Sequence, residues 1–484
     1  MASTGMLLVF AVYLLFTLVL GLLQARRTRT QSDFVLGGSR LPGWMLALSE
    51  RATGESAWLL LGFTGYVYAT GLSAIWIGVG CLAGIVTAWT LLAQQFRREA
   101  ARFGALTMPE YLAARFPQQA RPLRFLATLI IVFFFVFYVG AQFAGAGKTI
   151  QQTFGIDPFW GQLIAVAVIL TYSTVGGFIS VVAVDAFQAL LMITTLLVTP
   201  ILLWLGADGA HPSLASALAA AGPGADSWAG GLTGFSAGLL IFNHFAWYFG
   251  YLGGQPQLNA RFMAMPDDRQ VRRGRRLAVG WTVAAYAGAV LIGLGALREF
   301  GSGVVPDPEM ILPFVVTQMF PWWLAGILLA GVVAAMISTA ESMLLVAASS
   351  VSQDVYQGLL RKGRASDRAL LRVSRLATLG VGILGFVLAL TTEDLIYTIV
   401  SYAWAGIGCS FAPAVLLTFY WGRFSGRGAV ACLAAGLLTT VVWISMGWEQ
   451  VITARAVTFF VALAAGWLFG KPRSSDANRR WRST

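Results

Sequence analysis

Apolar segments about 20 residues long recur from one end of the chain to the other, each long enough for a helix to cross a bilayer. Of the 484 residues, 57% are apolar and only 11% are charged, a composition that excludes an ordinary soluble globular protein. The net charge of +12 would favour a nucleic-acid partner, but the basic residues are confined to short connections between the apolar segments. The pattern therefore predicts an all-α polytopic membrane protein whose partners include the lipid bilayer and no nucleic acid.

Windows of about 19 residues predict roughly thirteen transmembrane helices. We place them at 6–24, 44–70, 73–95, 123–146, 160–181, 184–206, 232–255, 277–297, 322–350, 373–391, 394–419, 428–446 and 451–470. The first run has no basic residue before it and three arginines soon after it, the reverse of a signal peptide, so we expect it to be retained. The amphipathic segment 307–320, between Pro306 and Pro321, is expected to be a helix on the outer surface.

The charges of the connections alternate along the chain. Lys and Arg gather after the first, third, seventh, ninth and eleventh predicted spans, whereas segments 151–160, 206–231 and 391–394 are nearly free of them. By the positive-inside rule, the basic connections face the cytoplasm. The N-terminus is therefore predicted outside and the basic tail, 471–484, in the cytoplasm, as in a multi-pass protein of the cell (inner) membrane.

The second predicted span has a polar middle, residues 49–56, with the sequence Ser-Glu-Arg-Ala-Thr-Gly-Glu-Ser. Charges inside a span cost about 2.5–3.5 kcal/mol each, so they are retained where they face an ion or substrate path. Gly54 is the predicted point at which this helix unwinds, and residues 250–254 interrupt the seventh span in the same way. Unwound backbone at membrane depth lines a protein cavity, where its carbonyls can hold a cation.

The two interrupted spans are five spans apart, and an odd offset inverts the second unit relative to the first. This spacing predicts a five-plus-five inverted repeat, with the first unit at 44–206 and the second at 232–419. The span at 6–24 and the two spans within 428–470 would be peripheral. Residues 1–484 are thus expected to form a single transmembrane transporter domain.

The ninth span carries a row of small and hydroxylated residues on one helix face, Ala335, Ser338, Thr339 and Ser342. Their oxygen atoms suit a monovalent cation, but the same residue types also allow close helix packing, and the spacing alone does not decide between the two. His244 in the seventh span also has two interpretations, as a relay group or as a hydrogen-bonded packing residue.

Six segments form a set of motifs that runs in order over nearly the whole chain. They are Phe34-Val35-Leu36-Gly37-Gly38, 56–61, 172–188, Gly254-Gln255-Pro256 with Ala260-Arg261-Phe262-Met263, 325–339, and Ser401-Tyr402-Ala403-Trp404-Ala405-Gly406. Together they resemble the sodium:solute symporter family, and most closely its sodium/proline symporters. The resemblance implies a five-plus-five inverted repeat with broken helices, the leucine-transporter-like fold, which agrees with the spans above.

The resemblance also implies a sodium site between the first broken helix and the ninth span. Carried over by position, its ligands are the backbone oxygens of Ala52 and Glu55, the carbonyl of Ala335, and the hydroxyls of Ser338 and Thr339. A second cation or proton site would use Asp185, Glu341 and Ser342. Sodium is the only metal implied, as a transported ion rather than a tightly held cofactor.

In the proline carriers a cage of aromatic side chains contacts the solute, and aromatic walls suit either an apolar ring or a cationic amine. The matching substrate-binding positions here are Ser56, Trp58, Tyr138, Trp247 and Tyr251. The other interpretation of these aromatic residues is that they fill the helix bundle.

Three positions depart from the sodium/proline symporters. Those proteins have an aspartate where this chain has Gly54, a non-acidic residue at the position of Glu55, and a serine-like residue at the position of Glu341. Glu55 has three interpretations: a salt bridge with Arg51 one turn back, a replacement for the charge lost at Gly54, or a proton carrier. The interpretation as a proton carrier also applies to Glu341, where a proton would replace a second sodium ion.

These features predict a symporter that couples inward sodium flux to uptake of a small amino-acid-like solute, with proline the best single prediction. A proton-coupled or cationic-substrate carrier on the same fold is the alternative. A membrane sensor is a further alternative, which the short tail after the last span disfavours. Two histidines and the lack of a clustered nucleophile and base argue against an enzyme. No obligate protein partner is indicated.

Overall fold

The computed structural model describes residues 4–205, 212–391 and 395–471, and in these residues the secondary structure is helical, without a strand. In chain order the helices are α1 (Thr4–Ala25), α2 (Gln31–Leu36), α3 (Gly43–Ala57), α4 (Thr64–Thr70), α5 (Ile75–Thr87), α6 (Ala93–Phe103), α7 (Met108–Arg115), α8 (Ala120–Phe154), α9 (Pro158–Leu205), α10 (Leu214–Ala221), α11 (Gly234–Phe245), α12 (Trp247–Tyr251), α13 (Pro256–Met263), α14 (Asp268–Phe300), α15 (Ile311–Met319), α16 (Trp322–Ser349), α17 (Asp367–Thr391), α18 (Ile396–Tyr420), α19 (Gly426–Ser445) and α20 (Ala454–Phe469). The prediction of an all-α membrane protein is confirmed.

Among the described residues, nine helical stretches are long and apolar enough to cross a membrane. Two of them are far longer than one crossing needs, with 61 residues in Gly43–Phe103 and 48 in Pro158–Leu205. A bilayer core about 30 Å thick takes about 20 helical residues, so each stretch must turn back. The first does so at Gly71, where φ is 71°, between the predicted spans 44–70 and 73–95. The total of thirteen spans stays a prediction.

The second long stretch, α9, leaves helical geometry at Gly177, where φ is 58° and ψ is −151°. This break lies earlier than the connection predicted between the spans 160–181 and 184–206. A Cβ at this position would lie 2.6 Å from the ring of Phe34, and the positive φ also disfavours any side chain. The position of the break therefore depends on a tertiary contact with α2, which the local sequence does not reveal.

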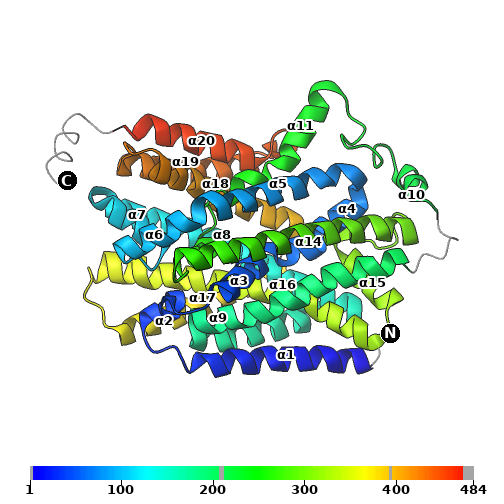
Figure 1. The fold of residues 1–484 in the computed structure, drawn as a ribbon, viewed down its shortest axis with the longest axis horizontal. Helices are drawn as coiled ribbons and strands as arrows, with labels where there is room; N and C mark the ends of the chain where they lie inside the picture. Colours follow the sequence, from blue (N-terminus) through cyan, green and yellow to red (C-terminus); the bar gives the residue numbers. More distant parts are fainter. Residues whose placement is uncertain (1–3, 206–211, 392–394, 472–484) are drawn as a thin grey trace.

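The helices differ strongly in how much of their surface is buried. In α16 and α18, 83% and 89% of the most apolar window is buried, against 28% for α1 and 33% for α19. Figure 1 shows α1 along one edge of the bundle and α19 and α20 along the opposite edge, with α3, α14 and α16 between them. The outer face of α1 carries exposed leucines, such as Leu8 and Leu15, as expected for contact with lipid. This arrangement agrees with peripheral spans at both ends of the chain, while the boundaries of the two repeats stay a prediction.

The first broken helix departs from helical geometry at Ser56, where φ is 44° and ψ is −174°. A π-helical turn, Trp58–Phe63, follows directly. The predicted break point, Gly54, is wrong by two residues, because residues 52–55 are helical. A Cβ at Gly54 would lie 3.4 Å from the guanidinium of Arg51, an ordinary van der Waals contact, so neither a break nor a close approach requires a glycine at this position.

The second broken helix agrees with its prediction. α12 ends at Tyr251, residues 252–255 are not helical, and α13 begins at Pro256. A side chain at Gly254 would overlap the carbonyl oxygen of Gly408 in α18. The glycine-rich sequence therefore allows the broken segment to lie directly against a central helix.

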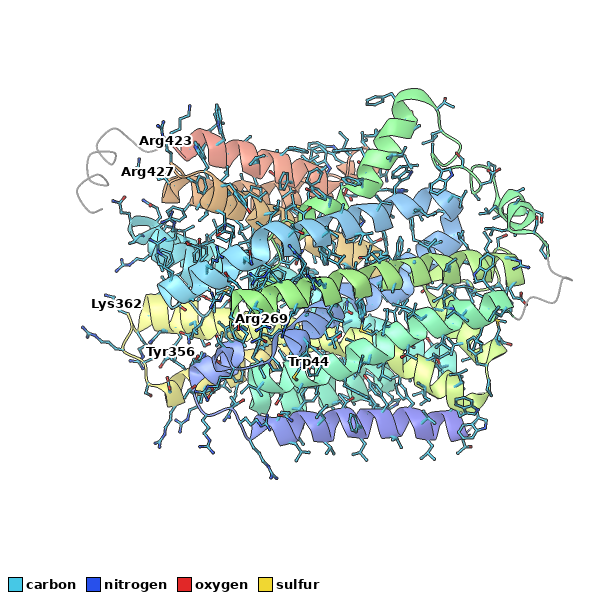
Figure 2. All side chains as sticks on the ribbon, viewed as in Figure 1. Trp44, Arg269, Tyr356, Lys362, Arg423 and Arg427 are labelled. Atoms are coloured by element: carbon cyan, nitrogen blue, oxygen red, sulfur yellow. The ribbon has the colours of Figure 1, made fainter. Side chains whose placement is uncertain are left out.

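The two ends of the bundle differ in charge. Figure 2 shows Lys362, Arg423 and Arg427 toward the same end, where they follow the ninth and eleventh predicted spans. The first turn of α1 and the last turn of α20 lie at opposite ends of the bundle (Figure 1). The placement of these ends relative to the membrane stays a prediction, and residues 472–484 of the predicted tail lie outside the described residues. The predicted helix within 307–320 is present as α15, which packs on α16 through an apolar face.

Candidate functional site

The end of α3 meets the middle of α16 at a group of carbonyl and hydroxyl oxygens. Ser338 Oγ lies 3.1 Å from the carbonyl oxygens of both Ala52 and Ala335, and Thr339 Oγ1 donates to the carbonyl of Thr53 at 3.1 Å. Both hydroxylated side chains are fully buried. A hydroxyl can turn its lone pairs toward a cation, and carbonyls beside a broken helix can coordinate sodium. The predicted residues Ala52, Ala335, Ser338 and Thr339 therefore lie together.

Glu55, the fifth predicted cation ligand, has different partners. Its carbonyl accepts the N–H of Trp58 across the break, and its carboxylate Oε1 accepts from Arg51 Nη1 at 2.8 Å. The salt bridge that was one of its three interpretations is therefore formed. Thr53 joins the group instead. Thr53 and Thr339 directly follow Ala52 and Ser338 in the sequence, and the two pairs make parallel contacts.

Arg51 lies between two carboxylates inside the bundle. It binds Glu50 through two nitrogen atoms and Glu55 through a third contact, and these side chains are at most 1% exposed. Trp89 Nε1 donates to Glu50 at 2.9 Å, and Thr282 Oγ1 lies 3.4 Å from Arg51. Two carboxyl groups thus share one guanidinium next to the carbonyls of the α3 end. The salt bridge with Arg51 leaves open the other two interpretations of Glu55, as a replacement for the charge missing at Gly54 and as a proton carrier.

A second buried cluster surrounds Asp185 of α9. Its Oδ2 accepts from Ser49 Oγ at 2.6 Å and from Arg261 Nη2 at 3.1 Å, and lies 3.4 Å from the hydroxyls of Thr53 and Ser342. Arg261 also contacts Ser342 through the same nitrogen and Ser49 through Nε. The predicted residues Asp185 and Ser342 are thus together. Arg261 lies in the last turn of α13, and in the sequence it is part of a motif and of the basic connection after the seventh predicted span, so its position gave no signal for this buried role.

Glu341 completes this cluster. It lies next to Asp185 and to the hydroxyl of Tyr172. Both of its carboxyl oxygens, and Asp185 Oδ1, are buried without a hydrogen-bond partner among the described residues. The two carboxyl groups share one guanidinium, Arg261, and three of their four oxygens have no hydrogen-bond partner among the described residues. Such a site favours either a cation or a shared proton.

We use the term cation region for these two neighbouring groups, which Thr53 connects. Its residues are Ser49, Ala52, Thr53, Asp185, Arg261, Ala335, Ser338, Thr339, Glu341 and Ser342. Thr53 donates or accepts at 2.9 Å with Ser342 Oγ, and its carbonyl binds Thr339. The same residue thus contributes its backbone to one group and its side chain to the other.

On the other side of the break, aromatic rings form a continuous cluster. The ring centres of Trp58 and Trp247 are 4.3 Å apart, those of Trp247 and Trp404 are 5.9 Å apart, and those of Tyr251 and Trp404 are 4.3 Å apart. All four side chains are at most 3% exposed. The predicted residues Trp58, Trp247 and Tyr251 are therefore in one place, together with Trp404, and with Tyr138 we call this set the aromatic cage.

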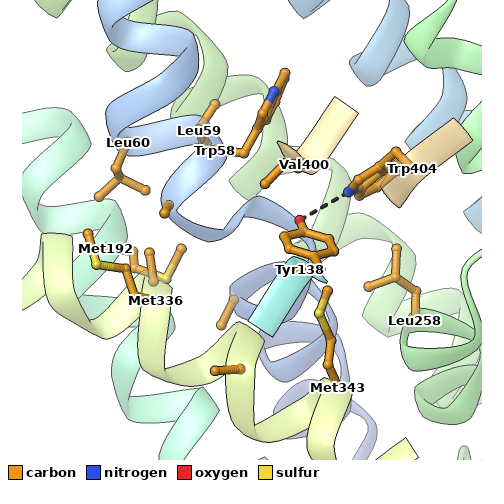
Figure 3. Packing of buried hydrophobic residues seen from close by; sticks show 14 of the residues in the cluster. Trp58, Leu59, Leu60, Tyr138, Met192, Leu258, Met336, Met343, Val400 and Trp404 are labelled. Atoms are coloured by element: carbon orange, nitrogen blue, oxygen red, sulfur yellow. Dashed lines mark hydrogen bonds between the residues drawn. The ribbon is translucent and has the colours of Figure 1, made fainter. Parts of the chain in front are cut away.

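Tyr138 of α8 connects the cage to the break. Its hydroxyl accepts from Trp404 Nε1 at 3.0 Å and donates to Ser56 Oγ at 3.1 Å, and Figure 3 shows the first of these bonds. Ser56 Oγ in turn accepts the N–H of Trp58 at 3.0 Å, and Gln142 Oε1 accepts the N–H of Ala57. Side chains thus satisfy backbone donors that the break frees. All five predicted substrate residues meet here.

Three aromatic residues at the cage were not predicted: Tyr286, Tyr397 and Trp404. Trp404 lies in a motif that the sequence singled out, so its aromatic side chain was a signal for it. Tyr397 lies 6.3 Å from Trp58 and 5.9 Å from Trp247 between ring centres, and Tyr286 donates or accepts with the Tyr251 hydroxyl at 3.3 Å. Neither had a local signal, because an aromatic residue in an apolar span is usually packing.

A pocket of about 380 Å³ opens beside the cage at the end of the bundle that carries the loop after α10. Tyr66, Thr70, Ser73 and His244 line one side of it, and residues 221–225 line the other. Tyr66 stacks on Tyr397 with ring centres 4.9 Å apart, so these rings lie between the pocket and Trp247.

His244 lies in the wall of this pocket. Its Nε2 is 3.2 Å from the Tyr66 hydroxyl and its Nδ1 is 3.0 Å from the carbonyl of Ser73. Both ring nitrogens thus have partners from neighbouring elements. This arrangement favours the interpretation of His244 as a hydrogen-bonded packing residue.

Comparisons with known proteins agree with this arrangement. Residues 34–436 match the family model "Sodium:solute symporter family". The chain is 34% identical to the sodium/proline symporter of Escherichia coli K12, over 99% of this chain and 96% of that protein. It is also 34% identical to the high-affinity proline transporter PutP of Bacillus subtilis 168, over 89% and 90%.

A solved structure of a Na⁺-coupled sialic acid symporter in an outward-open state superposes with a TM-score of 0.79, over 97% of this chain and 99% of that one. The sequence identity is 18%, so this likeness concerns the fold alone. Together with the match of the family model and the identity to curated relatives, the two broken helices and the groups around them place this chain in the sodium:solute symporter family.

Proposed function

We propose that this protein takes up a small amino-acid-like solute, with proline as the first candidate, by coupling it to inward movement of sodium. The observation that carries the proposal is the pair of contacts from Ser338 and Thr339 to the carbonyls of Ala52 and Thr53. These contacts lie within one helical turn of Ser56, which is hydrogen-bonded to the aromatic cage. An ion and a solute would therefore bind on two sides of the same break.

The break suggests how one binding event favours the other. Sodium between Ala52, Thr53, Ser338 and Thr339 would hold the end of α3 against α16. This would fix Ser56, whose side chain is bonded to Tyr138 and to the backbone of the cage segment. Bound sodium would thus order the segment around Ser56 before the solute binds. The solute would then lose less binding free energy in ordering this segment, which is positive coupling.

The sodium gradient is sufficient for this work. A potential of 100 mV contributes about 2.3 kcal/mol per charge, and a tenfold concentration gradient contributes about 1.4 kcal/mol more. One sodium ion can thus support accumulation of a neutral solute by several hundredfold or so.

The pockets at the two ends of the bundle support alternating access. The pocket of about 380 Å³ beside Tyr66 is far larger than the pocket of about 20 Å³ that Thr107, Met108, Pro256 and Ser349 line at the other end. With the basic connections in the cytoplasm, the larger pocket would face outward. With the same predicted orientation, the N-terminus would lie outside and the C-terminus in the cytoplasm of a cell-membrane protein.

Asp185, Glu341 and Ser342 are proposed as the second cation or proton site. The free acceptors of Glu341 and Asp185 favour occupation by a positive species, and a proton is sufficient because two carboxyl groups share the site. A carrier coupled to one sodium and one proton is therefore the second candidate. Uptake by wild type should then depend on an inward pH gradient. Loss of this dependence in Glu341→Gln would support coupling to a proton.

Proline is the first candidate because two relatives carry the names of proline transporters and because the cage suits an apolar ring. Apart from the lipid bilayer and this solute, we propose no obligate partner.

The test is uptake of radiolabelled proline into proteoliposomes with and without a sodium gradient. We expect sodium-dependent accumulation in wild type. Ser338→Ala and Thr339→Ala should each raise the sodium concentration for half-maximal uptake by roughly tenfold or more, because each removes an oxygen ligand.

Ser374→Ala is the matched control. Ser374 is equally buried, but its hydroxyl binds Gln31 and Ser352, away from both sites. This variant should leave sodium dependence unchanged. Uptake that is equal with and without sodium would reject the proposed coupling, and an unchanged sodium response in both hydroxyl variants would reject the ligand set.

A further inference from the structure

Arg455, at the start of α20, differs from the other buried arginines of the bundle. Arg51 binds Glu50, and Arg261 binds Asp185. Arg455 is only 4% exposed, yet no Asp or Glu of the described residues forms an ion pair with it. A charge buried without an opposite charge is strongly unfavourable unless something else compensates it.

The contacts of Arg455 point to the aromatic cage. Its guanidinium carbon lies 4.3 Å from the ring centre of Trp247, and one of its terminal nitrogens binds Ser401 Oγ. Its Nε has no hydrogen-bond partner. Glu449, the acidic residue nearest in sequence, accepts instead from Thr453 Oγ1 and from the backbone of Ala454. The guanidinium therefore lies against the ring face of Trp247, and its Nε–H is an unused donor.

Two further donors in the same cluster lack acceptors. The indole nitrogens of Trp58 and Trp247 are buried without a hydrogen-bond partner among the described residues. These two rings are in contact with each other, and Trp247 is in contact with Arg455. Three buried donors, one of them cationic, thus lie in one continuous group. A ligand that satisfies them must offer acceptors and negative charge.

The cation region has the opposite character. Its unpartnered atoms include Asp185 Oδ1 and both carboxyl oxygens of Glu341, which are acceptors. Free acceptors on one side of the break suit a cation, whereas free donors on the other side suit an anion. A carboxylate accepts only, and it can bind a guanidinium strongly.

We propose that Arg455 binds the carboxylate of the transported solute, and hence that the solute is a small carboxylic acid whose apolar part contacts Trp58 and Trp247. This inference rests on the proposed function, because it takes the aromatic cage as the solute site. It gives α20, which packs beside α18 at the edge of the bundle (Figure 1), a part in solute selection. A solute without a carboxylate leaves the charge of Arg455 buried and unpaired, so the site rejects it.

The test compares two ligands that differ only in the carboxylate. L-Proline and L-prolinamide share the ring and the amine, and binding of each to purified protein in sodium sulfate buffer is measured by isothermal titration calorimetry. Wild type should bind proline at least roughly tenfold more tightly than prolinamide. Arg455→Met should lose most of this preference, and Arg455→Lys should keep part of it, because a lysine retains the charge without the planar donors.

Lys471→Met is the matched control. Lys471 lies 4.6 Å from the ring centre of Trp467 at the other end of α20, so this variant also removes a cation from a tryptophan face. It should keep the preference of wild type. The midpoint of thermal unfolding, with and without sodium, checks that each variant folds and still responds to the ion.

The outcomes separate this inference from the proposed function. If Arg455→Met binds sodium and still prefers proline as wild type does, the inference is overturned while sodium-coupled uptake stands. If chloride added to the sulfate buffer displaces proline only when Arg455 is present, the arginine holds an inorganic anion and the inference is also overturned. If wild type binds no proline but prefers another carboxylate over its amide, and Arg455→Met loses that preference, the inference holds and proline is rejected as the solute.

Discussion

The cation region and the aromatic cage lie on two sides of one broken helix, yet they are built from different groups. The cation region combines carboxylates with hydroxyls and backbone carbonyls, and its unpartnered atoms include acceptors on Asp185 and Glu341. The cage consists of aromatic rings, and the unpartnered atoms of Trp58 and Trp247 are donors. Ser56 lies between the two, bonded to Tyr138 of the cage.

This difference suits the proposed function, in which one small break serves two ligands of opposite chemistry. A cation would bind where acceptors converge, and a solute would bind where donors and apolar rings converge. Because both sets depend on the position of the same few residues after Ala52, we expect filling one side to fix the geometry of the other. The following variants test whether each side binds its own ligand, and whether binding on one side strengthens binding on the other.

The largest effect is expected for Arg261→Met in the cation region. The variant leaves Asp185 and Glu341 facing each other without the guanidinium, and removal of one partner from a buried ion pair costs about 3–5 kcal/mol. We expect a large fall in thermal stability and loss of sodium-driven uptake. Differential scanning fluorimetry and proteoliposome uptake measure the two effects.

The double variant Arg261→Met/Asp185→Asn removes both charges and should recover much of the lost stability, but not sodium-driven uptake. Arg124→Met is the control, because Arg124 binds Asp354 at 2.7 Å in an ion pair away from both sites. It should lower stability without changing the sodium response. Equal sodium responses in the Arg261 and Arg124 variants would contradict a special role for Arg261.

A smaller effect is expected for Tyr138→Phe in the cage. The change removes the bonds to Ser56 and Trp404 and leaves the ring, so it should weaken solute binding by about 1–2 kcal/mol, roughly 5- to 30-fold. Sodium affinity measured without solute should change much less. Phe137, one position earlier and partly exposed, offers the control Phe137→Leu. Equal losses of sodium and solute affinity in Tyr138→Phe would show that the two sides are not separate.

The sequence was sufficient for the features that depend on local composition. Runs of apolar residues placed the helices, and the glycines before Pro256 placed the second break. The first break was misplaced because Gly54 is the residue with the highest intrinsic flexibility, whereas the chain actually breaks at Ser56. There, Gln142 of α8 accepts the freed N–H of Ala57, and the Ser56 hydroxyl, which Tyr138 holds in place, accepts the N–H of Trp58.

The same limit applies to the candidate site. The spacing of Ser338 and Thr339 left close helix packing as an alternative, and the family resemblance selected them as candidate ligands. Arg261 and Arg455 could not be assigned a role, because the meaning of a buried charge depends on its partner, and the partners come from distant helices. Asp185 is 76 residues from Arg261, and Ser401 is 54 residues from Arg455.

The smallest effect is expected for Glu309→Gln, a buried carboxylate outside both regions. Its oxygens accept from the backbone of Ile396 and Tyr397 at the start of α18, so its acceptors are satisfied, unlike those of Glu341. Burial raises the pKa of Glu309 above its usual value, although the two backbone N–H groups oppose this. The folded protein therefore holds the proton to a higher pH than the unfolded chain, and wild type should lose stability as the pH rises through the raised pKa.

Glu309→Gln has no such group to ionise, so its stability should lack this part of the pH dependence, and the two proteins should differ by about 1 kcal/mol or less at low pH. Thermal unfolding of both, between about pH 5 and about pH 8, measures the difference. Because Glu309 contacts neither the ion ligands nor the cage side chains, the sodium response of uptake should be unchanged. A difference that grows in favour of wild type as the pH rises would mean that the backbone donors, together with Lys148 at 3.8 Å, outweigh burial. In that case, a buried carboxyl group with full hydrogen bonding would need no further positive partner. Asp185 and Glu341, which are buried without full hydrogen bonding, would still need one.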